Sequence, residues 1–232
     1  MRSEPDPAGW HFIPGTARGV THFLRDMPNQ DSIAHEAAID LPATIVAVAD
    51  GHGHFRHARS ATGSALAVEV ACRVGAQFAA TLTGDPAAAG VAETVRDSLP
   101  QAIVGEWRTE VAKHLAAHPY TAQEQSALAD AGDEPEVPYG STLLFAVIAG
   151  GWLACAQIGD GDLLAVRPDG TALSPVPGDS RLDGQHTTSL CQPDAEDDFR
   201  TCALDLRADP LLALLLATDG YGNAQTAENW QP

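Results

Sequence analysis

Three apolar segments of this sequence each end in an aspartate that is followed directly by glycine. Asp50-Gly51 follows the run 41–49, Asp160-Gly161 follows 152–159, and Asp219-Gly220 follows 211–218. A single aspartate-glycine pair is a common turn former and would indicate only a turn. Three pairs after apolar runs deliver several carboxylates to the ends of rigid strands, and carboxylate and carbonyl oxygens are the ligands of Mg²⁺ and Mn²⁺. With Asn29-Gln30-Asp31 upstream, the pattern favours a divalent-cation site over three unrelated turns.

The segment 50–57 (DGHGHFRH) carries three histidines close to the first of these carboxylates. His52 could act as a general acid, because an unperturbed imidazole titrates near neutral pH. His52, His54 and His57 could instead ligate zinc, although their spacing lacks the intervening acidic residue of binuclear zinc hydrolases. A third interpretation is that they are solvated loop side chains.

Composition excludes several classes of function. The chain has 232 residues, 31 acidic and 13 basic side chains, and a net charge of −18, which argues against binding nucleic acid or an anionic membrane. The N-terminal decapeptide has no apolar run, and no segment approaches the roughly 20 apolar residues of a membrane span. The four cysteines lack metal-ligand spacing and are typical of reduced thiols, so we expect a cytoplasmic protein.

Apolar periodicity and turn residues predict the elements that must position the carboxylates. Helical patterns cover 58–82 and 89–118, with a kink at Pro100, and 119–138 and 174–200 are predicted to be loops, the second a flap. Apolar, β-branched or alternating runs predict strands at 41–49, 141–149, 152–158, 163–166, 202–206 and 211–217, with a hairpin turn at Gly150-Gly151. Strands linked by hairpins, with helices inserted early, predict antiparallel sheets covered by helices.

Five motifs in this order resemble the protein phosphatase type 2C family of metal-dependent serine/threonine phosphatases, and bacterial members most closely. They are NQD (29–31), VADGHG (48–53), GST (140–142), IGDGD (158–162) and ATDGYGN (217–223). The resemblance implies an α+β fold, a four-layer α/β/β/α sandwich, with the metal cleft at one end of two mainly antiparallel sheets. We therefore expect a loose tail over 1–14 and a phosphatase-like domain over 15–232.

The resemblance also implies a metal-ligand set. Asp50 would bridge two Mn²⁺ or Mg²⁺ ions, and Gly51 would add its backbone carbonyl. Asp31 would bind the second ion, Asp219 the first, and Asp160 a third, weaker ion.

Other residues would handle the substrate or support the site. His52 would protonate the leaving oxygen, and Arg25 would hold the substrate phosphate, with Arg18 as the alternative. The segment 140–142 would be structural, beneath the cleft.

The implied activity is hydrolysis of phosphoserine and phosphothreonine on proteins by a metal-activated water, opposing a protein kinase in bacterial signalling. The sequence departs from the family after Asp219, where we expect the usual final helix and strand, with their metal-binding aspartate, to be missing. Glu228 and Asn229 do not have the pattern of that strand. A non-catalytic pseudophosphatase that binds phosphorylated partners or a kinase is therefore the alternative.

Overall fold

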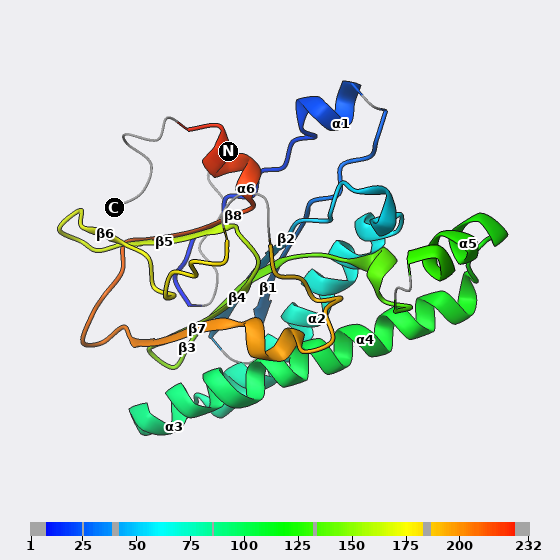
Figure 1. Cartoon of the computed structure of the whole chain (residues 1–232). Helices are drawn as coiled ribbons and strands as arrows, with labels where there is room; N and C mark the ends of the chain where they lie inside the picture. Colours follow the sequence, from blue (N-terminus) through cyan, green and yellow to red (C-terminus); the bar gives the residue numbers. More distant parts are fainter. Residues whose placement is uncertain are drawn as a thin grey trace.

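The computed structural model describes residues 8–24, 26–38, 42–84, 86–131, 134–182 and 187–225. The chain forms two antiparallel sheets that pack face to face and are flanked by helices (Figure 1). The predicted α+β class, with two antiparallel sheets and flanking helices, is confirmed. No helix in the described part of the chain is both long enough and apolar enough to cross a membrane.

The larger sheet has five strands in the order β1-β2-β3-β4-β7. Their bounds are Ser32–Ala38, Ala43–Ala49, Leu143–Ala149, Trp152–Ile158 and Arg200–Asp205. All seven residues of β3 and all seven of β4 are buried, which explains their continuous apolar runs. The turn between them is made by Gly150 and Gly151 at φ 57° and 80°, so the predicted hairpin is confirmed.

The smaller sheet has three strands in the order β6-β5-β8. They are Asp162–Val166 (β5), Ala172–Leu173 (β6) and Ala213–Ala217 (β8). Leu163 pairs with Leu216 and Ala165 with Leu214, so one face of this sheet is apolar and packs on the five-stranded sheet. Within the described residues, only the short helix α6 (Asp219–Asn223) adjoins the end of β8.

Helices cover the outer face of the five-stranded sheet (Figure 1). They are α2 (Ser60–Thr81), α3 (Ala88–Glu93) and α4 (Leu99–Ala117), with a π-helical turn, η2 (Thr94–Ser98), between the last two. The predicted interruption near Pro100 is therefore present, and it takes the form of this turn just before the proline. The indole of Trp107 is buried between α4 and α2 and donates to the carbonyl of Gly63 at 3.0 Å.

Two expectations from the sequence are wrong or incomplete. Helix α5 (Ala122–Ala131) occupies part of the predicted loop 119–138. Its start is a capping box, in which Thr121 Oγ1 accepts from the Glu124 amide at 3.3 Å and Glu124 accepts from the Thr121 amide at 2.8 Å. Strand β1 was not predicted, because SIAHEAA has a weak apolar alternation.

The remaining short elements are α1 (Val20–Leu24), η1 (Phe55–His57), η3 (Val137–Tyr139) and η4 (Ala195–Asp198).

Close packing of α2 against η3 generates the first prediction. A methyl group at Gly63 would clash with the backbone carbonyl of Tyr139, whereas one at Gly105 of α4 would meet no atom within 4 Å. We expect Gly63→Ala to lower the free energy of unfolding by about 1–3 kcal/mol, and Gly105→Ala to raise it by about 0.5–1 kcal/mol. Urea denaturation of both variants measures the difference. Equal effects of the same sign would contradict this packing.

Candidate functional site

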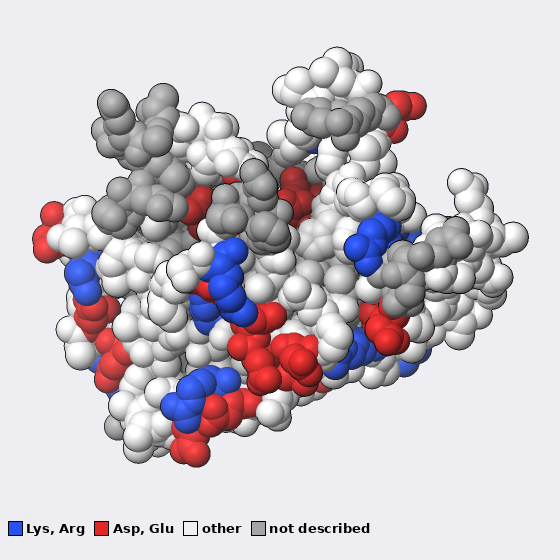
Figure 2. Space-filling model, viewed as in Figure 1, with Lys and Arg blue, Asp and Glu red and all other residues white. Residues whose placement is uncertain are grey.

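One cleft of about 970 Å³ opens at the end of the two sheets and is lined by all four acidic residues of the predicted metal set. These are Asp31, Asp50, Asp160 and Asp219, which come from four separate strand ends. Figure 2 shows the hollow beside the projecting segment that carries α1, with acidic atoms at its floor. The fold therefore brings together carboxylates that are up to 188 residues apart in the sequence, from Asp31 to Asp219 (219 − 31).

Asp50 stands at the centre of the site because its backbone is fixed at the end of β2. Its amide donates to Thr142 Oγ1 at 3.0 Å, and its carbonyl accepts from the Thr142 amide at 2.9 Å and from Ser141 Oγ at 3.1 Å. Gly51 follows, and a Cβ there would lie 2.9 Å from the backbone carbonyl of Ser60. The segment 140–142 thus supports the aspartate from beneath, as the structural role expected for it requires.

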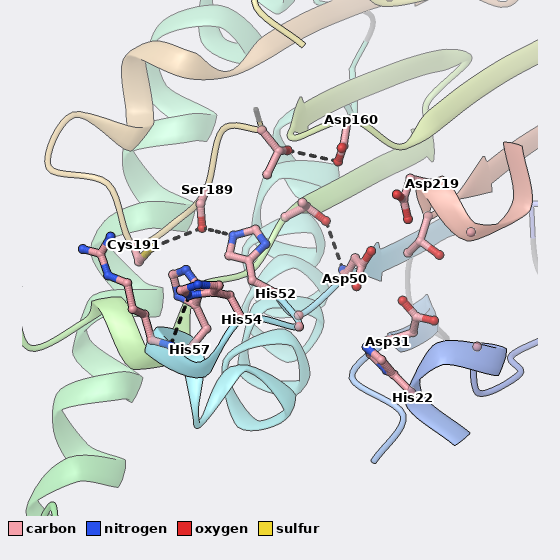
Figure 3. A pocket seen from close by; sticks show the side chains of 18 of the residues that line it. His22, Asp31, Asp50, His52, His54, His57, Asp160, Ser189, Cys191 and Asp219 are labelled. Atoms are coloured by element: carbon pink, nitrogen blue, oxygen red, sulfur yellow. Dashed lines mark hydrogen bonds between the residues drawn. The ribbon is translucent and has the colours of Figure 1, made fainter. Parts of the chain in front are cut away.

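The carboxylates of Asp31 and Asp219 flank that of Asp50 (Figure 3). Burial, followed by the charges of Asp31 and Asp219, raises the pKa of Asp50 well above the usual range of a carboxyl. The pKa of Asp31 is also raised, chiefly by burial. At neutral pH, therefore, the group cannot carry its full negative charge without a compensating cation.

The donor chemistry of this group fits a hard divalent cation. It offers carboxylate oxygens and the Gly51 backbone, and like-charge repulsion is relieved when a cation lies between them. In the described part of the chain, no three histidine, cysteine, aspartate or glutamate side chains already converge as a metal-ligand group. A bound cation would complete its coordination with water.

Asp160 lies apart from these three carboxylates, at the turn between β4 and β5 (Figure 3). Its Oδ1 accepts from Thr187 Oγ1 at 3.0 Å. The same turn is fixed by Thr188, whose Oγ1 accepts from the Gly159 amide at 2.9 Å, and by Gln157, which donates to the Gly161 carbonyl at 2.5 Å. Asp160 therefore has a separate, firmly held position at the cleft wall.

His52 lines the cleft, but its ring is turned toward Ser189 (Figure 3). Its Nε2 lies 2.8 Å from Ser189 Oγ, and Ser189 Oγ in turn lies 3.3 Å from Cys191 Sγ. Burial lowers the pKa of His52 to about 4, and the nearby His57 adds to this effect. The pKa of His52 thus lies below that of a free imidazole, because the ring is shielded from water and lies beside another histidine.

Within the described ranges, His52, His54 and His57 do not converge as a metal-ligand group. The His57 Nδ1–H donates to the Val137 carbonyl at 2.5 Å, His52 Nε2 pairs with Ser189, and His54 Nδ1 accepts from the Arg56 amide at 3.4 Å. These contacts fix the orientation of the three rings.

The two arginines expected to bind phosphate have different standings in the structure. Arg25 lies outside the described residues, so its predicted contact with phosphate remains a prediction. Arg18, the alternative, donates to the Met27 carbonyl at 3.3 Å and stacks over Phe23 with its guanidinium carbon 4.9 Å from the ring centroid. Arg56 is the arginine that lines the cleft among the residues described.

Sequence reasoning also missed several cleft residues, among them His22, Arg56, Thr187 and Ser189. His22, on α1, lies close enough to Asp31 to lower the pKa of the Asp31 carboxyl, whereas burial raises that pKa. Thr187 and Ser189 come from the segment predicted as a flap. The sequence offers only weak signals for them, because a lone histidine and loop hydroxyls are common at any surface.

Comparison with known proteins agrees with this architecture. The family profile described as Protein phosphatase 2C matches residues 18–232. A bacterial serine phosphatase is 15% identical over 87% of this chain and 76% of its own, with a TM-score of 0.53.

A serine-threonine phosphatase 2C from Toxoplasma gondii is 16% identical over 87% and 76% of the two chains, with a TM-score of 0.49. The catalytic domain of the serine threonine protein phosphatase PstP, in complex with two manganese ions, is 19% identical over 87% and 75%, with a TM-score of 0.42. No curated protein sequence matches the chain. Because the family profile spans nearly the whole sequence, this chain belongs to the protein phosphatase 2C family.

Proposed function

We propose that this protein hydrolyses phosphoserine and phosphothreonine monoesters on proteins, using divalent cations held at the floor of the cleft. The observation that carries the proposal is the meeting of Asp31, Asp50 and Asp219 in one partly buried group. Family membership supports the reaction class. The substrates are phosphorylated proteins, and the enzyme opposes a serine/threonine kinase in the cytoplasm.

Asp50 would hold two cations, Mn²⁺ or Mg²⁺, with the Gly51 carbonyl as a further ligand. Asp219 would bind the first of these cations and Asp31 the second, and Asp160 would bind a third ion. When bound, such cations supply Lewis acidity that activates water and offsets the charge of the phosphoryl group.

His52 is the group proposed to give a proton to the leaving seryl or threonyl oxygen as the phosphorus–oxygen bond breaks. In the free protein its ring is neutral at pH 7 because its pKa is lowered to about 4. A phosphate dianion in the cleft would raise that pKa, since an adjacent negative charge stabilises the imidazolium. Ser189 orients the ring through its contact with Nε2. His52 thus becomes a competent acid chiefly when substrate is present.

A guanidinium would hold the phosphate before and during the reaction, because its geometry suits bidentate binding of phosphate oxygens. Arg25 has this role by resemblance to the family. Arg56 is a second candidate, supported by its position on the cleft wall.

The alternative function is that of a non-catalytic module with the same fold. Such a module would bind phosphorylated proteins in the same cleft without turning them over. Metal-dependent turnover separates the two functions.

We expect the protein to hydrolyse p-nitrophenyl phosphate only with Mn²⁺ or Mg²⁺, and Asp50→Asn to lower kcat/KM by about a hundredfold or more, because one carboxylate shared by two cations is lost. Asp97→Asn is the matched control, since Asp97 is exposed and pairs with Arg96 away from the cleft. Steady-state kinetics with and without metal provide the measurement.

The Asp50→Asn variant should remain folded, because it removes a buried carboxyl whose pKa is raised by its neighbours. Its melting temperature in EDTA is therefore expected to equal or exceed that of the wild type. Folded wild-type protein with no turnover at any metal concentration would favour the non-catalytic module.

The role of His52 predicts a dependence on the leaving group. We expect His52→Gln to lower kcat for a phosphoserine peptide by about a hundredfold. For p-nitrophenyl phosphate, whose leaving group needs little protonation, the loss should be less than about tenfold. Ser189→Ala should produce the same pattern with a smaller loss of kcat, because it removes only the hydroxyl that orients the ring of His52. Equal losses on both substrates would refute proton donation by His52.

A further inference from the structure

A second cavity of about 340 Å³ lies between the loop that follows Asp50 and helix α5. Its lining is mainly apolar, and Phe55 and Pro138 form one side while Ala127 and Leu128 of α5 form the other. Its volume is at the lower end of the range of roughly 300–1,000 Å³ that is typical of ligand pockets. We call it the α5 groove.

The α5 groove adjoins the catalytic cleft. Arg56 lines both cavities, so the two meet at this arginine. The loop 51–58 therefore presents one side to the cleft, through His52 and His54, and another to the groove, through Phe55.

Phe55 has a side chain that is costly to leave in water. It is 77% exposed, although it lies beside a groove with an apolar lining. Large exposed aromatic groups next to an apolar depression are characteristic of binding surfaces. Covering Phe55 and Leu128 together would remove apolar area that the described fold leaves in contact with solvent.

The far wall of the groove is held in place rather than loosely attached. Arg59 binds both carboxylate oxygens of Glu124 on α5, at 2.8 and 3.0 Å, and also donates to Tyr139 at 3.0 Å. Its guanidinium carbon lies 4.3 Å from the centroid of the Tyr120 ring. The bidentate geometry of this half-buried ion pair anchors α5 against the loop. A pre-formed wall reduces the ordering cost of binding.

We propose that the α5 groove binds an apolar side chain of the substrate polypeptide, near the phosphorylated residue, while the phosphate occupies the cleft. This inference rests on the proposed phosphatase function, because that function supplies the extended chain leaving the cleft. The groove accepts one side chain, whereas a stable dimer would bury about 800 Å² on each partner. The protein thus selects phosphorylated sites that have a large aliphatic or aromatic residue at a fixed distance.

The test measures binding of labelled peptides that carry a non-hydrolysable phosphonate analogue of phosphoserine, by fluorescence anisotropy in Mn²⁺. Leucine replaces alanine in turn at each position on either side of the analogue. We expect one position at which leucine tightens binding by about tenfold, as burial of its additional methyl and methylene groups allows.

Two variants of α5 decide whether the groove is responsible. Ala127→Trp fills the groove, and Ala129→Trp makes the same change at an exposed position of the same helix that does not line it. The leucine preference should fall below about twofold in Ala127→Trp and persist in Ala129→Trp. Hydrolysis of p-nitrophenyl phosphate, which is too small to reach the groove, should change by less than about twofold in either variant.

Three results would overturn the inference: no leucine preference at any position, a preference that survives Ala127→Trp, or no binding of the peptides. If p-nitrophenyl phosphate is hydrolysed in any of these cases, the proposed function stands and only the groove assignment fails. If the protein has no hydrolytic activity but shows the leucine preference and its loss in Ala127→Trp, the groove assignment stands and the proposed catalysis fails.

Discussion

The mutual repulsion of Asp31, Asp50 and Asp219 is the constraint on which this structure depends. The fold buries Asp50 and places two further carboxylates against it, in a protein whose net charge is already −18. Both effects raise the pKa of Asp50, so the group lowers stability at neutral pH unless protons or cations compensate it. Proteins retain such strained groups where function requires them. The carboxylates of the cleft therefore favour the binding of cations, and bound cations would in turn bind the phosphate.

The rest of the architecture holds this group in place. Pairing of β2 with β3 brings 140–142 beneath Asp50, and Thr142 and Ser141 bind its backbone amide and carbonyl. Helix α2 packs so closely that Gly51 has no room for a side chain. The walls of the cleft include His22, from the short helix α1, and, at the other end beside His52, residues of the loop 187–192. The site thus combines a rigid carboxylate floor on strand ends with side walls built from connecting segments, where sequence can vary at little cost to the core.

The sequence predicted the features that depend on residues close together in the chain. Strand-end carboxylates, the Gly150-Gly151 hairpin and the long helices follow from apolar periodicity and turn residues, and the structure contains them. It did not predict the surroundings of His52, because Ser189 is 137 residues away and only the tertiary fold brings the two together. Helix α5 was missed although Thr121 and Glu124 form a capping box, since acidic and glycine residues around it are typical of loops. The α5 groove could not be predicted, because its two walls come from separate segments.

The most direct test of the account is calorimetric titration of the metal-free protein with Mn²⁺ at pH 7, in buffers of different ionisation enthalpy. Because the pKa values of Asp50 and Asp31 are both raised, this pair retains protons in the absence of cations, and saturable binding should release protons. The Asp50→Asn variant should bind far more weakly and release no proton from this position, whereas Asp97→Asn should behave as the wild type. Mn²⁺ binding that is unchanged by Asp50→Asn, or no saturable binding to the wild type, would contradict the assignment of these carboxylates as the cation centre.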